Sequence, residues 1–390
     1  MSVFHRLIGQ EKVVALLKQS SLNKRSGVES GHAWLFTGPP GSGRTIAARA
    51  FAASLVCTGE EPGCGTCTEC QQVMNETHAD VEYVRTDGVS IAIEDVRDVV
   101  SRAYIRPSSA QYRIIIIEDA DRMPERTTNV LLKAIEEPPQ STIWILCTPS
   151  TEDVLPTIYS RCRHVQLGVP STEDVSRHLI DSFQIDADHA HVVARVSNNH
   201  IGRARGLAGD KFAWDYRQKI LRASFAVHNI CDAVFMSSFI MNSLKDAENA
   251  DRMNSLGAEK NEGSDEEKLI DFKRSLGIGE GERVPAVLRK QVKDFEEELK
   301  RKATRRIRDA LERIMLDMIA LYRDVIFVHM SLGDGLINVD FDEDIHRIST
   351  FIPADEALRR IDIIFDARER LARNCAPQLV MEAMWAQLCV

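Results

Sequence analysis

The strongest constraint on the fold of this chain is a glycine-rich loop, residues 38–45, which reads Gly-Pro-Pro-Gly-Ser-Gly-Arg-Thr. An apolar run at residues 33–36 precedes the loop, and a helical stretch at residues 45–55 follows it. A strand, a glycine-rich loop and a helix in this order are typical of a phosphate-binding loop. The glycines let backbone N–H groups point at an anion, and the helix N-terminus adds the positive end of its dipole.

One position of the loop departs from the G-x-x-x-x-G-K-[ST] pattern. Arg44 stands where a lysine reaches the β- and γ-phosphates, whereas Gly38, Gly41, Gly43 and Thr45, the last in the Mg²⁺-ligand position, keep the pattern. Arginine is a longer, planar fork with a different hydrogen-bond geometry from the compact lysine ammonium. We therefore expect a phosphate-loop fold without efficient nucleotide hydrolysis. The alternative is an unrelated Gly-Pro-rich turn.

An acidic pair, Glu118-Asp119, follows the apolar run at residues 114–117. In nucleotide hydrolases such a pair normally offers Asp to Mg²⁺ and Glu to the attacking water. Here the order is reversed. The Glu118 side chain is one methylene too long for the metal position, and the Asp119 side chain is one methylene too short for the water-activating position. A misplacement of about 1 Å can cost about 10²-fold in rate. The pair therefore predicts impaired hydrolysis, unless the strand simply ends in solvated acids.

Strand and helix patterns divide the chain into regions. Apolar strand segments alternate with helical segments up to residue 170, which predicts a parallel α/β sheet domain. The segments read as strands are 33–36, 81–84, 113–117, 142–147 and 164–167. Residues 171–208 and 209–390 are helical in pattern, and an acidic, polar stretch at about 245–285 predicts a flexible insertion. A basic run at residues 300–306 is interpreted as a solvated helix face.

Composition excludes several classes of protein. The 390 residues are 44% hydrophobic and 27% charged, as in an ordinary soluble protein. No apolar run approaches the ~20 residues of a membrane span, and the N-terminus lacks a secretory signal pattern, so a cytoplasmic location is expected. The net charge of −9 argues against a protein that coats nucleic acid.

Four cysteines, Cys57, Cys64, Cys67 and Cys70, lie close together in the sequence. Their two adjacent C-x2-C steps suit tetrahedral Zn²⁺ ligation, and in a cytoplasmic chain such clustering favours a metal over disulfides. We predict a structural zinc site. Iron–sulfur ligation and four unligated thiols are the alternatives.

Several of these motifs together resemble one family. Ile-Gly-Gln at residues 8–10, the loop at 38–45, the four cysteines, the string N-V-L-L-K-A-I-E-E-P-P at residues 129–139 and Ser-Arg-Cys at residues 160–162 resemble bacterial clamp-loader subunits. These are the AAA+ subunits of the DNA polymerase III holoenzyme. The resemblance spans residues 1–208. It implies an AAA+ P-loop domain at 1–170 with the zinc module at 57–70, and a small helical lid domain at 171–208. A weaker resemblance implies an all-α collar, or oligomerisation, domain at 209–390.

Within this family, gamma/tau subunits keep the loop lysine and hydrolyse ATP, whereas delta prime subunits typically have a degraded loop and do not. Arg44 and the reversed Glu118-Asp119 favour the delta prime type. The resemblance implies gamma/tau and delta partners in a hetero-pentameric ring, a sliding clamp, and primer-template DNA reached through the complex, with no membrane. Polymerase activity would belong to the holoenzyme. The alternatives are an ATP-hydrolysing gamma/tau-type subunit and a scaffold that uses no nucleotide.

The resemblance also assigns roles to single residues. Arg161 would act in trans as an arginine finger in the ATP site of a neighbouring gamma/tau subunit, and its alternative is a plain surface arginine. Thr148 and Arg205 match the positions of the first and second nucleotide sensors, or are inherited structure without that role. Whether ATP or ADP binds at the degenerate site stays open.

Overall fold

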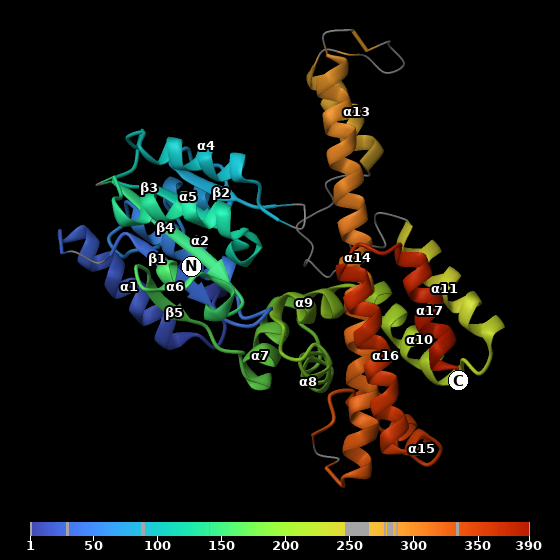
Figure 1. Cartoon of the computed structure of the whole chain (residues 1–390). Coiled ribbons are helices and arrows are strands. Elements are labelled where there is room, and N and C mark those ends of the chain that lie inside the picture. The colour runs from blue at the N-terminus through green and yellow to red at the C-terminus, as the bar shows by residue number, and fades with distance from the viewer. Residues whose placement is uncertain are drawn as a thin grey trace. The chain divides into compact units, whose positions relative to one another are not determined.

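The computed structural model describes residues 2–28, 31–86, 90–139, 141–245, 265–276, 278, 284–285, 288–332 and 335–389 (Figure 1). The chain divides into two compact units, Met1–His178 and Leu179–Val390. The unit boundary falls within helix α7 (Thr172–Phe183). A separate lid domain at 171–208 stays a prediction.

The first unit contains a five-stranded parallel sheet in the order β2-β3-β4-β1-β5. Its strands are β1 (Ala33–Thr37), β2 (Val81–Val84), β3 (Arg113–Ile117), β4 (Thr142–Thr148) and β5 (Arg163–Gln166). This confirms the predicted parallel α/β domain. The fifth strand begins and ends one residue before the predicted segment.

Helices cover both faces of the sheet, which explains why its central strands are almost continuously apolar. Every residue of β1 and β4 is buried. On one face, Trp34 packs edge-to-face on Phe51 with ring centroids 4.6 Å apart. Helices α1 (Glu11–Arg25), α2 (Arg44–Val56) and α3 (Thr68–Met74) share that core. The opposite core contains α4 (Ile93–Ala103), α5 (Glu125–Glu136) and the short α6 (Pro156–Tyr159).

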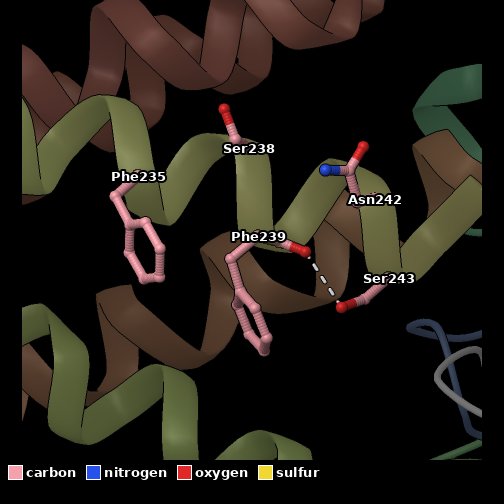
Figure 2. A pocket seen from close by; sticks show the side chains of 5 residues that line it. All are labelled: Phe235, Ser238, Phe239, Asn242 and Ser243. Atoms are coloured by element: carbon pink, nitrogen blue, oxygen red, sulfur yellow. Dashed lines mark hydrogen bonds between the residues drawn. The ribbon is translucent and has the colours of Figure 1, made fainter.

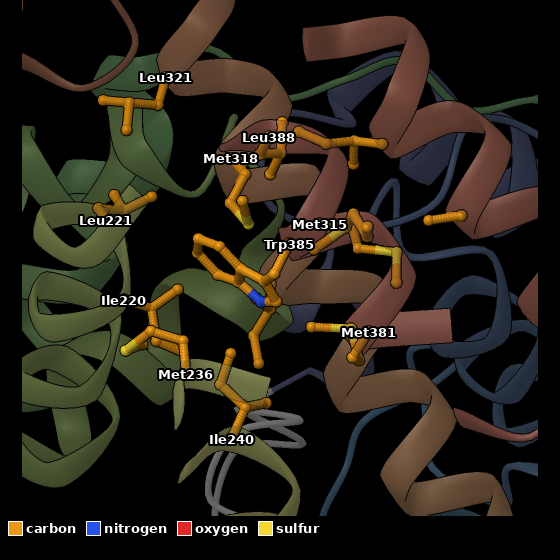
Figure 3. Packing of buried hydrophobic residues seen from close by; sticks show 14 of the residues in the cluster. Ile220, Leu221, Met236, Ile240, Met315, Met318, Leu321, Met381, Trp385 and Leu388 are labelled. Atoms are coloured by element: carbon orange, nitrogen blue, oxygen red, sulfur yellow. The ribbon is translucent and has the colours of Figure 1, made fainter. Parts of the chain in front are cut away.

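The regular structure in the described part of the second unit is helical. Its helices after α7 are α8 (Ala187–Val196), α9 (Ile201–Gly209), α10 (Lys211–Ala226), α11 (Ile230–Lys245), α13 (Asp265–Ser275), α14 (Arg289–His329), α15 (Asp342–Ser349), α16 (Ala354–Ala372) and α17 (Pro377–Leu388). Trp385 is fully buried in the core of this unit, among Met315, Met318 and Ile240 (Figure 3). The apolar residues of α14, which recur at helical spacing, form one side of that core.

Helix α13 was not expected from the sequence. It packs on α14, where Phe272 stacks on Phe295 with ring centroids 4.1 Å apart, and Arg306 forms an ion pair with Asp265. Most of the rest of the predicted flexible insertion at 245–285 lies outside the described residues. Among the described helices, none is both long enough and apolar enough to span a membrane.

Candidate functional site

The carboxyl edge of the sheet brings the loop at 38–45 next to the ends of β4 and β5. Thr37 is in register with Thr148 on one side and Gln166 on the other. The N–H of Gly38 donates to the carbonyl of Pro149 at 3.2 Å. This edge is where parallel α/β sheets bind ligands. Gly38, Thr148 and, beyond β4, the acidic pair after β3 therefore share one edge.

The glycines of the loop are required by its backbone. Gly41 and Gly43 have φ of +86° and +87°, and Gly43 is the N-cap of α2. A Cβ on Gly38 would lie 2.6 Å from the carbonyl oxygen of Leu167. The loop therefore keeps a shape that side chains larger than hydrogen would disrupt.

Arg44 is engaged with its own loop. Its Nη1 donates to the carbonyl oxygen of Gly38. Burial lowers the pKa of Arg44, and the nearby Cys147, Asp121 and Asp119 oppose that shift. The guanidinium thus satisfies a loop carbonyl, whereas the lysine of the family pattern reaches the phosphates.

Glu118 belongs to a ring of four charged side chains that the sequence did not predict. Its two carboxylate oxygens lie 3.3 Å from Arg49 Nη2 and 2.9 Å from Arg85 Nε. Glu76 closes the ring at 2.6 Å from each of the same two arginines. No motif marks Arg49, Glu76 or Arg85, which come from α2, the segment after α3 and the segment after β2.

The ring neutralises Glu118 where a metal-binding carboxylate would stand. Burial by itself would lower the pKa of Arg85, but the contacts with Glu76 and Glu118 raise it. The same arginines lower the pKa of Glu76, again against burial. The ring of Tyr83 lies 5.7 Å from Arg49 and 5.3 Å from Arg85. A divalent cation at Glu118 would have to displace two guanidinium groups.

The remaining predicted residues of this edge are placed as follows. Asp119 is partly exposed, and its Oδ2 lies 3.9 Å from Arg122 Nε. The buried hydroxyl of Thr148 donates to the carbonyl of Ser150 at 3.1 Å. Thr45 is half-buried in the first turn of α2.

Arg161 follows α6 at the surface of the first unit. Its Nη1 donates to the carbonyl of Thr157 at 2.9 Å and to Ser160 Oγ at 3.2 Å. Its Nη2 lies 2.8 Å from Glu136 Oε1, and the Arg161 side chain is 39% exposed. The role of Arg161 as an arginine finger stays a prediction.

Arg205 lies on α9 in the second unit and is exposed. The side chain of its near neighbour Arg203 is instead largely buried and paired with Asp317 of α14. Burial lowers the pKa of Arg203 to about 9. The sensor role of Arg205 stays a prediction.

The four cysteines converge in the first unit, and their sulfur atoms all lie within 4.8 Å of one another. Cys57 Sγ and Cys67 Sγ are 3.9 Å apart. Tetrahedral zinc with Zn–S bonds of about 2.3 Å places ligand sulfurs ~3.8 Å apart. The donor set and its spacing therefore fit a metal ion such as zinc.

Backbone N–H groups point at these sulfurs. Cys64 N donates to Cys57 Sγ at 3.5 Å, Cys67 N to Cys64 Sγ at 3.4 Å, and Cys70 N to Cys67 Sγ at 3.4 Å. A hydrogen bond from Thr66 is the main cause that lowers the pKa of Cys64 to about 5, whereas burial raises the pKa of Cys70. N–H···S bonds stabilise thiolates, which are the form that binds metal.

The module is attached to the domain by tight contacts. A Cβ on Gly59 would lie 3.0 Å from Cys64 Sγ, and one on Gly63 would lie 2.7 Å from Val3 Cγ2. Arg25 donates to the carbonyls of Gly59 and Cys57 at 2.8 and 2.5 Å. The cluster is therefore built into the fold.

A shallow hollow on α11 carries no comparable chemistry. It is lined by Phe235, Ser238, Phe239, Asn242 and Ser243, none of which is ionisable at neutral pH (Figure 2). Ser243 Oγ donates to the carbonyl of Phe239 at 2.9 Å.

Comparison with known proteins shows a similarity that covers part of the chain. Residues 9–171 match the family model described as DNA polymerase III, delta subunit. These residues are thus similar in sequence to DNA polymerase III subunits. The match covers the sheet, the loop, the four cysteines and Arg161.

Three relatives show the range of the similarity. The chain is 30% identical over 58% of its length to DNA polymerase III subunit gamma of Buchnera aphidicola subsp. Schizaphis graminum. It is 23% identical over 99% of its length to subunit tau of Bacillus subtilis, and 29% identical over 56% to subunit delta′ of the same organism. The chain spans 58%, 61% and 65% of the lengths of these relatives, respectively. Gamma, tau and delta′ subunits are thus all similar to it.

Among solved structures, a DNA polymerase III gamma subunit-related protein from Thermotoga maritima aligns with 95% of this chain and 98% of its own length. The TM-score is 0.46 and the identity 16%.

Proposed function

We propose that this chain is a delta prime-type subunit of a bacterial DNA polymerase III clamp loader, active in DNA replication. It would be a non-hydrolysing AAA+ subunit that supplies Arg161 to the ATP site of a neighbouring gamma/tau subunit and helps place the sliding clamp on primed DNA. The observation that carries the proposal is a contrast between two sites. Glu118, at the metal position of the chain's own site, is paired with two arginines, whereas Arg161 reaches the surface.

Three features argue against hydrolysis at the chain's own site. Arg44 donates to the loop instead of presenting a lysine ammonium, Glu118 is neutralised by Arg49 and Arg85, and Asp119 has too short an arm for water activation. Hydrolysis needs the cation, the metal and the positioned water together. Any catalysis in which this chain takes part would therefore occur in an assembly.

Arg161 suits a role in such an assembly. An arginine keeps its charge at any physiological pH and can spread it over the oxygens of a transferring phosphate. Cys162, the next residue, packs against the buried core beside α5 and α6, so the base of Arg161 is fixed. The same proposal implies gamma/tau and delta subunits in a hetero-pentameric ring, with primer-template DNA contacted through the complex.

We assign the four cysteines to a structural zinc ion. Cys57, Cys64, Cys67 and Cys70 would fill all four positions of a tetrahedral site, which leaves none for substrate. Bound there, zinc would join α2, α3 and the segment between them.

The test uses the assembled complex. Wild-type protein and Arg161→Ala are each mixed with gamma/tau and delta subunits, and assembly and DNA-stimulated ATP hydrolysis are measured. A finger supplies about 10³-fold or more at its site, so Arg161→Ala should remove the activity of the site that it completes while the complex still assembles. Unchanged hydrolysis in an assembled complex would disprove the finger role.

A second candidate, an ATP-hydrolysing gamma/tau-type subunit, is favoured by the similarity to gamma and tau relatives. It requires ATP turnover by the purified chain alone, which separates it from the first proposal. A scaffold without nucleotide chemistry would show no effect of Arg161→Ala in any assembly.

A further inference from the structure

Glu136 and Arg161 face each other from two elements that share one core. Glu136 is the last residue of α5, directly after Ile135, which is 1% exposed. Arg161 follows α6, whose Ile158 is also 1% exposed and belongs to the same cluster. Both charged side chains therefore start from backbone positions that are fixed by a buried core.

The contacts of Arg161 divide its guanidinium into two parts. Nη1 donates to two acceptors from its own turn, the carbonyl of Thr157 and Ser160 Oγ. Nη2 faces the Glu136 carboxylate at 2.8 Å. A guanidinium has five N–H donors, of which Nη1 carries two. The Nη2 side is thus the part that meets an anion.

We propose that Glu136 is a positioning residue that stands in for the phosphate in the unassembled subunit. This inference rests on the proposed function of Arg161. The carboxylate holds the Nη2 side of the finger and is exchanged for the neighbour's phosphate when the finger engages. Nη2 carries two N–H groups, but a phosphate and the Glu136 carboxylate on the same nitrogen would repel each other, so we expect the Glu136 ion pair to open at that step.

The expected effect is modest because the pair is partly exposed, at 39% for Arg161 and 44% for Glu136. Exposed ion pairs contribute little free energy, so loss of the Glu136 charge should change the rate of this step by only about 1.5- to 5-fold. Removing the Glu136 charge should therefore speed the step in which Arg161 engages the phosphate. The effect should weaken with salt, since the Debye length falls from about 10 Å at 0.1 M to about 3 Å at 1 M.

The experiment measures single-turnover ATP hydrolysis by the complex reconstituted with gamma/tau and delta subunits. The variants are Glu136→Gln, the adjacent and also exposed Glu137→Gln as matched control, Arg161→Ala, and the double variant of positions 136 and 161. We expect Glu136→Gln to raise the rate about 1.5- to 5-fold at low salt and less at high salt. Glu137→Gln should match wild type, and Glu136→Gln should have no effect when Arg161 is absent.

The outcomes separate the two proposals. If Arg161→Ala leaves the rate unchanged in an assembled complex, the proposed function is wrong. If Arg161→Ala lowers the rate but Glu136→Gln does not raise it, only the role of Glu136 is wrong. An equal effect of Glu136→Gln with and without Arg161 would likewise overturn that role. Thermal melting of each variant verifies that all compared proteins are folded.

Discussion

Arg49 Nη2 lies 3.3 Å from Glu118 Oε1, although the two residues are 69 positions apart in the chain. Arg49 stands on α2, which follows the loop at 38–45, and Glu118 directly follows β3, where the sequence pattern predicts a metal-binding position. Glu76 and Arg85 close this pair into a ring, so each of the four charges has two partners of opposite sign.

The ring predicts a stability effect of Glu118→Gln. Removing this 14%-exposed carboxylate leaves Arg49 and Arg85 with Glu76 alone, so we expect a loss of about 1–2 kcal/mol in the free energy of unfolding, between the values for exposed and for fully buried pairs. Denaturant unfolding measures it. Glu82→Gln, which breaks the partly exposed pair of Glu82 with Arg102, serves as control and should cost less. Equal stability of Glu118→Gln and wild type would contradict the account.

Restoring the loop lysine alone should not restore hydrolysis. In Arg44→Lys, Glu118 keeps its pairing with Arg49 and Arg85, and Asp119 still has the shorter arm. We expect the purified variant to show no ATP turnover above that of the unaltered protein. Turnover that appears with this single change would mean that the acidic pair is competent.

The sequence predicted the sheet well because its signals are local. The apolar runs of β1, β3 and β4 are bounded by turn residues, and the alternation of strands with helices implies that the strands run parallel. The convergence of the four cysteines was also predictable, since the spacing between Cys64, Cys67 and Cys70 is itself the geometric constraint.

The charged partners could not be predicted. Arg49, Glu76 and Arg85 carry no periodic or motif signal, and their meeting with Glu118 depends on tertiary packing. Glu136 was visible only as part of the 129–139 string, and its contact with Arg161 required the placement of α5 beside α6. Helix α13 was missed because its stabilising partner, Phe295, lies on another helix.

The four-cysteine site predicts about one zinc per chain by elemental analysis of protein purified without chelators. Cys64→Ser should lower the zinc content and the melting temperature, because it removes one of four ligands. Cys231→Ser, at an exposed cysteine outside the cluster, should change neither. Wild-type protein free of zinc and iron would contradict a metal site.

Asp80 predicts a specific dependence of stability on pH. The buried carboxylate accepts backbone N–H bonds from Ser108, Ser109 and Ala110 at 2.7, 2.8 and 2.9 Å. Burial by itself would raise the pKa of Asp80, but these donors hold it well below its usual value. Because the folded pKa is depressed, the contribution is present above the unfolded pKa of about 3.9 and is lost as pH falls toward the folded pKa.

The variant that tests this is Asp80→Asn. We expect it to destabilise the protein by about 2–3 kcal/mol near pH 7. Its difference from wild type should shrink below about pH 4, as denaturant unfolding at several pH values would show. Asp98→Asn, at an exposed position on α4, controls for the loss of one negative charge. A difference that stays constant or grows toward pH 3 would contradict the role given to Asp80.

The most direct test of the central claim, that the chain's own nucleotide site is catalytically silent, is ATP turnover by the purified chain without partners. The account predicts no turnover above background, and no change in Thr45→Ala, since Arg44 and Glu118 are both engaged within the protein. Turnover by the wild-type chain that is lost in Thr45→Ala would contradict the claim.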